Sequence, residues 1–304
     1  MNKEQTTLKV DSISQLHHLM GLPGPKHPLL SLVDNDQLKS GPAEGAKSIS
    51  MRFYGLSYKE AVNGKMGYGQ GYYDFDEGGM IFTAPNQVIG TYESHNSHTG
   101  KTIFFHPDLL FNYPLGKSIS KYGFFDYQLY EALHLSESEK AIILGLFTNI
   151  ENELSTSIDE MSQDVLVSYL EVLLSYSQRF YKRQFITRKA VNHDLLTRME
   201  QLLNSYFDQQ KPLQHGLPTV EYLAGELNVS PRYLSDMLRS LTGQNAQQHI
   251  HEKLIAKAKE LLSTTSLSVA EIAYELGFER PQSLNKLFKK KLNLSPLEFR
   301  TSFN

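Results

Sequence analysis

Basic and amide side chains cluster in the segment YELGFERPQSLNKLFKKK, residues 274–291. Five of its eighteen residues are Lys or Arg, and large apolar side chains lie between them. Guanidinium, ammonium and amide groups donate hydrogen bonds to phosphate oxygens and to the edges of bases. Taken alone, however, a charge run of this kind favours the solvated face of a helix.

The same pattern occurs twice in the chain. Residues 220–241 match residues 269–291 at an offset of 49 before the turn and 50 after it. Ala224 and Ala273 occupy the same place in the two copies, three residues before a leucine. A small side chain is expected there because the two helices of a helix-turn-helix cross closely. The duplication predicts two helix-turn-helix units, at about 220–241 and 269–291, and favours DNA as the partner of the charged face.

Local signals mark where the helices of these units begin. Ser230 and Pro231 suit an N-cap and a first helical residue, and Ser268 with Glu271 suits a capping box. The sequence SPLE at 295–298 predicts a last short helix. Between the units, QQHIHEKLIAKAKELL predicts a rigid spacer helix of roughly 20–25 Å. Recognition helices about one DNA turn apart, roughly 34 Å, reach successive major grooves.

The second helix of each unit presents polar side chains away from the core. We expect eight of them to contact base edges: Arg232, Tyr233, Ser235, Asp236, Arg280, Gln282, Asn285 and Lys286. We expect three to contact phosphates: Arg239, Lys289 and Lys290. The distribution of charge supports this, because residues 218–304 carry 11 Lys and Arg against 9 Asp and Glu although the whole chain has a formal net charge of −3.

Two other regions precede the duplicated one. Residues 1–135 are rich in Gly, Pro, Asn and aromatic residues and hold short strand-like segments between turn residues, which favours a β-sandwich or small barrel. From Ser136 the apolar residues follow helical spacing, in two segments that end near Tyr181. The wide apolar stripe of the second segment suits packing on the β-rich region and on a second copy of the helix. We therefore expect three regions: 1–135, 136–190 and 191–304.

Composition excludes several classes of site. The 304 residues include no cysteine, so a disulfide framework, a thiolate metal site and a cysteine nucleophile are excluded. The longest apolar runs are far shorter than the roughly 20 residues of a membrane span. The first residues lack the layout of a secretory signal. These features predict a soluble, cytoplasmic protein without a membrane partner.

Two groups of side chains raise other functions. His95 and His98, with Glu93, suggest a metal site, but residues three apart on a hairpin point to opposite faces, and we expect no metal and no cofactor. Seven aromatic residues line either a small-ligand pocket or, more simply, the core of the β-rich region: Tyr54, Tyr58, Tyr68, Tyr72, Tyr73, Phe75 and Phe82. The sequence holds no G-x-S-x-G motif, phosphate-binding loop or cluster of His ligands, so we expect no enzyme.

The duplicated region resembles the C-terminal DNA-binding domain of the AraC/XylS family of bacterial transcription regulators. The resemblance covers about 219–300 and depends on LAGELNVSPRYLSDMLRSLTG, KAKELL and SVAEIAYELGFERPQSLNKLFKKKLNLSPLEFR, in this order and at these separations. Three residues depart from the family pattern: Leu254 where an Arg is frequent, Leu284 where an aromatic is frequent, and Asn293 in place of Gly. Asn still adopts the left-handed conformation that Gly supplies.

The resemblance implies an architecture and a function. Members of the family commonly join two helix-turn-helix units and a linker helix to an N-terminal cupin-like β-barrel that senses an effector, and to helices that dimerise. By resemblance, the chain is an α+β multidomain protein and a sequence-specific transcription regulator, either an activator or a repressor. Its implied partners are double-stranded DNA, a second copy of itself, RNA polymerase and a small-molecule effector. The alternatives are a cupin-type metal-dependent enzyme and a DNA-binding protein without an effector.

Overall fold

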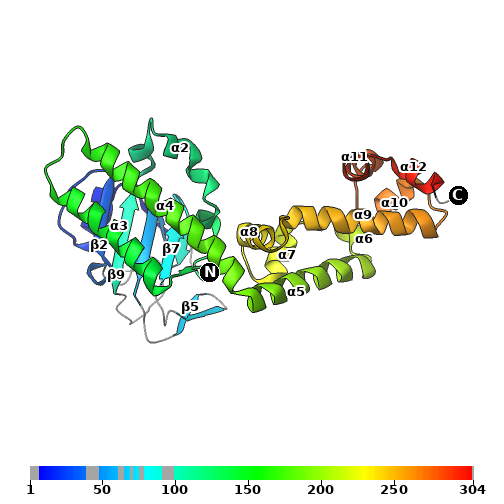
Figure 1. Cartoon of the computed structure of the whole chain (residues 1–304), viewed down its shortest axis with the longest axis horizontal. Helices are drawn as coiled ribbons and strands as arrows, with labels where there is room; N and C mark the ends of the chain where they lie inside the picture. Colours follow the sequence, from blue (N-terminus) through cyan, green and yellow to red (C-terminus); the bar gives the residue numbers. More distant parts are fainter. Residues whose placement is uncertain are drawn as a thin grey trace, which may run out of the picture. The chain divides into compact units, whose positions relative to one another are not determined.

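The computed structural model describes residues 7–38, 48–60, 65–68, 71–74, 79–90 and 99–302. The chain divides into two compact units, Met1–Gln184 and Phe185–Asn304, and Figure 1 labels their elements. The first unit combines strands with helices, and the described residues of the second are helical, with connecting turns. The expected three-part division at 135 and 190 stays a prediction.

The strands of the first unit form three sheets. The largest is antiparallel, in the order β10-β7-β4-β9-β2. Its strands are β2 (Leu30–Asp34), β4 (Tyr54–Lys59), β7 (Gly79–Thr83), β9 (Gly100–Phe105) and β10 (Leu133–His134). The second, in the order β1-β3-β8, holds β1 (Thr7–Val10), β3 (Ser48–Met51) and β8 (Val88–Gly90). The third is the antiparallel pair of β5 (Lys65–Tyr68) and β6 (Gly71–Asp74).

None of these sheets closes on itself within the described residues. In the largest sheet, β2 and β10 each pair with a single strand, so the sheet does not close into a barrel. The mixture of sheet and helix expected for the first half of the chain is confirmed. A closed small barrel is not formed by the strands described, and the cupin-like architecture is not confirmed.

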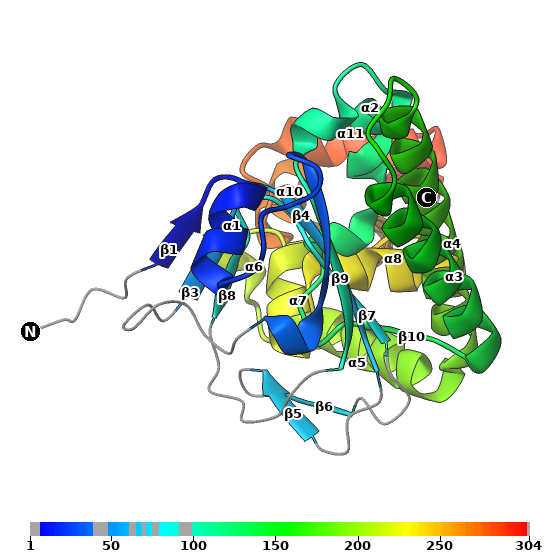
Figure 2. The ribbon, with the colours of Figure 1, turned by 90° about the vertical axis from the view of Figure 1, so that its left-hand side faces the viewer.

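Other elements cover both faces of the large sheet. Helix α1 (Ile13–Met20) and the β1-β3-β8 sheet lie on one side, and α3 (Glu137–Ser155) and α4 (Ser162–Thr187) lie on the other (Figure 2). The shorter helical elements are η1 (Asn35–Gln37), η2 (Pro107–Leu110), α2 (Pro114–Ser118), η3 (Ile119–Lys121) and η4 (Gly123–Asp126). On the α1 side, buried apolar side chains join the two sheets: Val10, Ile13, Leu16, Val33, Ile49, Met51, Phe53 and Phe104.

Aromatic rings fill the interface between the large sheet and the helices. Tyr54 stacks on Phe105 with 4.9 Å between ring centroids, and Phe82 lies 6.0 Å from Tyr181 of α4. Phe82 and Tyr58 are buried, and Tyr54 is half-buried. Tyr54, Tyr58 and Phe82 are therefore part of the core, the simpler of the two roles that the sequence allows. Four of the other residues that raised a pocket or a metal site lie outside the described part of the chain: Phe75, Glu93, His95 and His98. For three more, only the backbone belongs to the described part: Tyr68, Tyr72 and Tyr73.

The second unit is built from helices α5 to α12. Their bounds are α5 (Lys189–Asp208), α6 (Pro212–His215), α7 (Val220–Leu227), α8 (Pro231–Thr242), α9 (Ala246–Thr264), α10 (Val269–Glu275), α11 (Pro281–Leu292) and α12 (Pro296–Thr301). No helix in the described part of the chain combines the length and the apolar character that crossing a membrane requires.

The predicted N-caps of helices α8 and α10 are formed. The Ser230 hydroxyl accepts the backbone N–H of Tyr233 at 3.1 Å, and Ser268 forms the predicted capping box with Glu271. The spacer helix α9 is longer than predicted, at 19 residues or roughly 28 Å. It begins one residue earlier than predicted, at Ala246, where Asn245 and Gln248 form a further capping box, and it ends two residues later, at Thr264.

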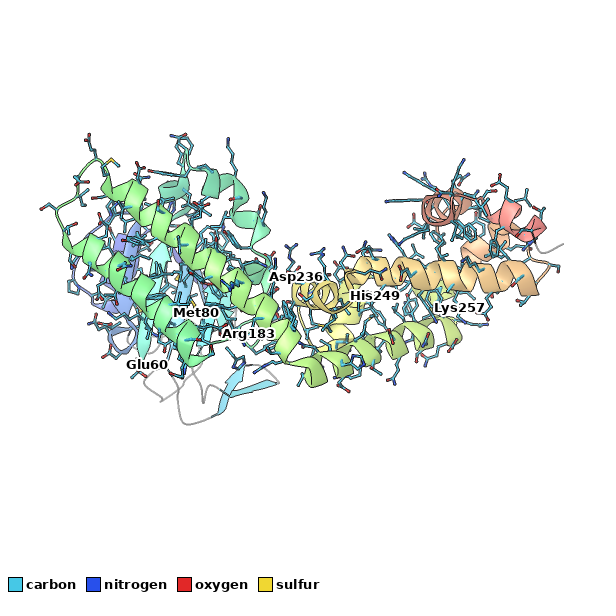
Figure 3. The ribbon with its side chains drawn as sticks, viewed as in Figure 1. Glu60, Met80, Arg183, Asp236, His249 and Lys257 are labelled. Atoms are coloured by element: carbon cyan, nitrogen blue, oxygen red, sulfur yellow. The ribbon has the colours of Figure 1, made fainter. Side chains whose placement is uncertain are left out.

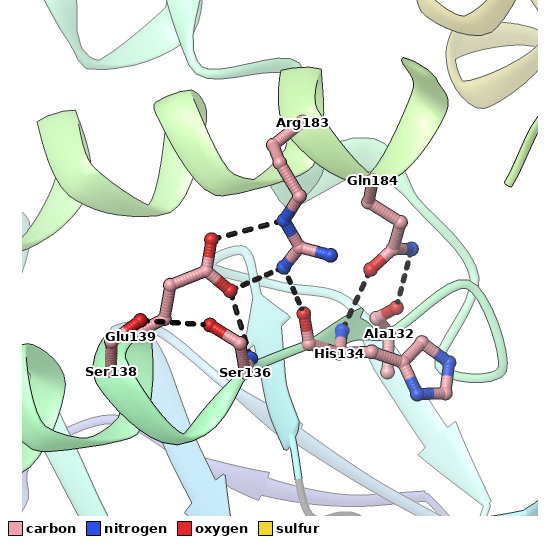
Figure 4. A network of polar contacts seen from close by, with 7 residues as sticks. All are labelled: Ala132, His134, Ser136, Ser138, Glu139, Arg183 and Gln184. Atoms are coloured by element: carbon pink, nitrogen blue, oxygen red, sulfur yellow. Dashed lines mark hydrogen bonds and ion pairs between the residues drawn. The ribbon is translucent and has the colours of Figure 1, made fainter. Parts of the chain in front are cut away.

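A polar network ties the C-terminal part of α4 to α3 and to the edge strand β10 (Figure 4). Arg183 Nε donates to Glu139 Oε1 at 3.0 Å, and its Nη2 donates to the other oxygen of Glu139 and to the carbonyl of His134. The backbone N–H of His134 donates to Gln184 Oε1 at 2.7 Å, and Gln184 Nε2 donates to the carbonyl of Ala132 at 3.2 Å. The Gln184 amide thus pairs with β10 as a neighbouring strand would.

Replacement of Arg183 by Met is expected to lower the free energy of unfolding of the first unit by about 2 kcal/mol. The Glu139 side chain is only 12% exposed and would lose its charged partner, while the 34% exposure of Arg183 keeps the loss below that of a fully buried pair. Denaturant unfolding of the full chain, followed by circular dichroism, measures the change. The exposed neighbour Lys182, also replaced by Met, is the control, and equal losses would contradict a specific role for the network.

Candidate nucleic-acid interface

Helices α7 and α8 form the first helix-turn-helix unit. Ala224 of α7 is fully buried, and its carbonyl accepts the backbone N–H of Val229 at 3.0 Å. Asn228 ends α7 in the left-handed conformation, with φ of 55°. The buried face of α8 consists of Leu234, Met237 and Leu238, which leaves its polar residues on the other faces.

Helices α10 and α11 repeat this arrangement. Ala273 is fully buried, and its carbonyl accepts the backbone N–H of Phe278 at 2.9 Å. Gly277 takes the left-handed conformation in the turn, with φ of 89°. Leu284 and Phe288 of α11 are fully buried beneath the helix. The two helix-turn-helix units predicted from the duplication are thus both present.

The outer face of α11 brings together the candidate residues of the second unit. Arg280 is the N-cap residue, and it and five residues of the helix are exposed: Gln282, Asn285, Lys286, Lys289 and Lys290. Asn285, Lys286 and Lys289 also line one groove of about 510 Å³, together with Val269, Ser295 and Leu297. The contribution of α12 to this groove was missed from the sequence, where its SPLE signal indicated only a helix start.

The candidate residues of α8 are engaged with one another. Asp236, labelled in Figure 3, lies 3.2 Å from Arg232 Nε and 3.1 Å from Arg239 Nη1, with its side chain 17% exposed. Arg232 Nε is out of line for a hydrogen bond, so its contact with the carboxylate is ionic. The spacings i,i+4 and i,i+3 within α8 are a sequence signal for such pairs.

Two further candidates of α8 are partly covered. The ring of Tyr233 meets that of Phe185 edge-on, with 5.2 Å between centroids. Phe185 is itself buried, and Tyr233 and Ser235 are both half-buried. The polar face of α8 therefore offers less exposed surface than that of α11.

The basic C-terminal end of α11 lies beside α9. Lys291 lies 3.8 Å from Glu252 of α9, whereas Lys289 and Lys290 form no ion pair with any residue in the described part of the chain. On the same helix, burial lowers the pKa of His251, and the nearby charges of Lys291 and Lys290 lower it further. Among the described residues, no group of three His, Asp or Glu side chains is placed to hold a metal ion.

Residues 223–302, which include most of both units, match a family described as a helix-turn-helix domain. The chain is 27% identical over 146 residues to the uncharacterized HTH-type transcriptional regulator YfiF of Bacillus subtilis (strain 168), covering 48% of this chain and 43% of that protein. It is 28% identical over 140 residues to the HTH-type transcriptional activator RhaS of Salmonella newport (strain SL254), covering 46% and 45%. The chain thus spans less than half the length of these relatives.

Solved structures give matches of the same kind. The C-terminal domain of AraT, a response regulator from Geobacillus stearothermophilus, is 31% identical with a TM-score of 0.32, covering 36% of this chain and 84% of that one. The DNA-binding domain of AdpA in complex with a target DNA is 28% identical with a TM-score of 0.31, covering 34% and 91%. The sequence matches and the presence of two helix-turn-helix pairs agree in one conclusion: the C-terminal part of this chain is a helix-turn-helix domain of the AraC type.

Proposed function

We propose that the chain is a sequence-specific transcription regulator whose two helix-turn-helix units bind successive major grooves of double-stranded DNA. The observation that carries the proposal is the outer face of α11, where amide and basic side chains lie exposed on the second helix of a helix-turn-helix unit. A helix in this position enters the major groove. Spacer helix α9, roughly 28 Å long, suits units separated by about one turn of DNA.

The side chains of α11 divide into two roles. Gln282 and Asn285 have the amide groups that pair with adenine, and Lys286 and Arg280 suit guanine. Lys289 and Lys290 follow one turn later, near the end of the helix, and suit phosphate. Base contacts set the sequence that is bound, and phosphate contacts supply affinity that falls with salt.

In α8, the proposed contacts depend on Asp236. Arg232, Tyr233 and Ser235 remain candidate base contacts and Arg239 a candidate phosphate contact. Because Asp236 pairs with both Arg232 and Arg239, we assign it the role of holding the two guanidinium groups in place. A carboxylate can also accept a hydrogen bond from cytosine, so a direct base contact by Asp236 is compatible with this role.

We further propose that the first unit mediates formation of a homodimer. Support comes from a face of α3 that is exposed and carries no charge: Ser138, Ala141, Ile142, Gly145, Thr148, Asn149 and Asn152. Ile142 is 37% exposed, and nothing lies within 4 Å of a Cβ atom built at Gly145. The cores of protein interfaces are depleted in charge, and a glycine permits close approach of a second helix.

The proposal also includes a cupin-like sensor in the first unit, a small-molecule effector, contact with RNA polymerase and an activator or repressor role in the cytoplasm, as the family resemblance implies. Support for an effector with hydrogen-bonding groups comes from the polar residues of the sheet face toward α1. On that face, Ser57 and Thr102 hydroxyls lie 2.8 Å apart, and Thr102 donates to Asn35 at 2.6 Å. Lys59 alternates onto the same face, and burial lowers its pKa to about 8.

Selection of bound sequences from random double-stranded DNA by the full chain tests the central proposal. We expect enrichment of two short half-sites whose centres are about one helical turn apart. A selection that enriches no sequence above the starting pool would contradict it.

Replacement of Asn285 by Ala and of Lys289 by Ala should have different effects on DNA binding. Asn285→Ala should cost about 1–3 kcal/mol with the selected sequence and relax the preference at one base pair. Lys289→Ala should weaken binding to all sequences alike and reduce the slope of log affinity against log salt by about one. Fluorescence anisotropy on matched and mismatched duplexes measures both, and an unchanged salt slope for Lys289→Ala would contradict its phosphate role.

Replacement of Asp236 by Ala should strengthen binding to random DNA and lower the preference for the selected sequence. The change removes one negative charge and releases Arg232 and Arg239 toward phosphates, so the salt slope should steepen by about one. Glu226→Ala on α7 removes an equally negative, exposed side chain and serves as the control. Equal effects of the two substitutions would show that general charge, rather than the pairing on α8, accounts for the result.

Replacement of Gly145 by Glu should convert a dimer into a monomer, because it places a carboxylate at the centre of the uncharged face of α3. The thermal stability of each protomer should hardly change, since the added side chain meets no atom of its own unit within 4 Å. Sedimentation velocity measures the association state. Ser168→Glu adds the same charge at an exposed position of α4, and a dimer that resists Gly145→Glu would exclude this face.

A further inference from the structure

The turn between α10 and α11 touches the segment that precedes α7. A Cβ atom built at Gly277 would lie 2.6 Å from the carbonyl carbon of Gly216, 2.7 Å from its oxygen and 3.0 Å from the backbone nitrogen of Leu217. These are backbone atoms, which do not move aside as a flexible side chain would. Helix α6, which ends just before Gly216, also contacts α10. We call the approach of Gly216 to Gly277 the glycine contact.

The first copy shows that backbone conformation alone does not require a glycine at this position. Asn228 occupies the equivalent place in the first helix-turn-helix unit, 49 residues earlier, and adopts the left-handed conformation with φ of 55°. Gly277 has φ of 89°, in the positive-φ region that Asn tolerates better than most other residues. What differs in the second copy is the backbone of Gly216, which leaves no room for a Cβ atom.

Gly216 is held in place by residues that pack against the first helix-turn-helix unit. The hydroxyl of Tyr206, on α5, donates to the carbonyl of Gly216 at 3.0 Å, and Tyr206 is only 3% exposed. The Tyr206 ring packs against Tyr222 of α7 with 5.2 Å between centroids. Lys211 in turn donates to the Tyr222 hydroxyl at 3.2 Å. A continuous series of contacts thus runs from α7, through Tyr206 and Gly216, to the turn between α10 and α11.

This series joins the two helix-turn-helix units by a second route besides α9. Helices α8, α10, α11 and α12 all pack on α9, so α9 fixes how far apart the units lie. A single connecting helix restrains rotation of one unit about the helix axis less well than it restrains distance. A second contact away from that axis removes the rotation, because two points of attachment define an orientation that one does not.

We propose that the glycine contact sets the twist and spacing between the recognition helices α8 and α11, and thereby the separation of DNA half-sites that the protein accepts. Gly216, Gly277 and Tyr206 are positioning residues in this assignment and touch no DNA themselves. The assignment rests on the proposed function as far as DNA is concerned, while the coupling of the two units does not. One base pair changes the half-site separation by about 3.4 Å and its rotation by about 35°, so a fixed pair of units should discriminate strongly between spacings.

The C-cap of α8 supplies a matched control. Gly243 has φ of 79° with nothing within 4 Å of a built Cβ atom, and the equivalent residue of the second copy is Asn293, with φ of 58°. Gly277→Asn and Gly243→Asn therefore make the same chemical change in the same backbone region. Only Gly277→Asn forces Gly216 away. Thermal unfolding of the full chain first establishes that both variants fold.

Binding is then measured to duplexes that carry the selected half-sites at their preferred spacing and at one base pair more or less. Wild type and Gly243→Asn should lose roughly tenfold or more in affinity when the spacing changes. Gly277→Asn should bind the preferred spacing roughly tenfold more weakly and lose most of the discrimination between spacings. Retention of the wild-type spacing preference by Gly277→Asn would overturn the proposal.

A measurement without DNA separates this proposal from the proposed function. The chain has no cysteine, so spin labels on Glu226→Cys of α7 and Ser283→Cys of α11 report one distance in the full chain. The distance distribution should be narrow in wild type and Gly243→Asn and broad in Gly277→Asn. Tyr206→Phe removes only the hydroxyl that holds Gly216 and should also broaden the distance distribution. It serves in place of Gly277→Asn if that variant fails to fold. Narrow distributions throughout would overturn the coupling even if the chain binds DNA as proposed.

Discussion

The two helices of each helix-turn-helix unit meet at a place where a methyl group fills the available space. Ala224 and Ala273 are fully buried there. The carbonyl of each accepts a backbone N–H from the turn that follows, that of Val229 in the first pair and that of Phe278 in the second. A larger side chain would separate the helices or turn one of them, since close-packed interiors leave no room for added methylene groups. The direction of α8 and of α11, and so of every polar side chain that they carry, follows from this crossing.

The two units share that crossing but use it differently. In α11 the polar residues project from a helix whose buried face is Leu284 and Phe288, and the ends of Lys289 and Lys290 are exposed. In α8 the carboxylate of Asp236 neutralises part of the charge of two arginines. A neutralised guanidinium releases fewer counterions on meeting a phosphate, so in the proposed DNA complex we expect the second helix-turn-helix unit to supply more of the salt-dependent affinity. Duplication has thus produced two units of one shape and unequal electrostatic strength.

The sequence was sufficient for features that depend on residues close together in the chain. The caps at Ser230 and Ser268 involve partners three residues away, and the outward face of α11 follows from the spacing of Leu284 and Phe288. Contacts between distant residues left no such signal. Phe185 meets Tyr233 across 48 positions, and nothing in either residue type identifies the other as its partner. Tyr54 and Phe82 were compatible with a pocket or a core, and only the packing of α4 on the sheet distinguishes the two.

The amide of Gln184 has a consequence for how the sheet of the first unit ends. An edge strand with unpaired backbone groups is a template for pairing with another molecule, and proteins commonly cover or charge such edges. Here the N–H of His134 and the carbonyl of Ala132 are taken up by one side chain of α4, so the strand β10 is closed without a further strand. Unwinding of that part of α4 would free both backbone groups, and β10 would then present the unpaired edge that promotes intermolecular strand pairing.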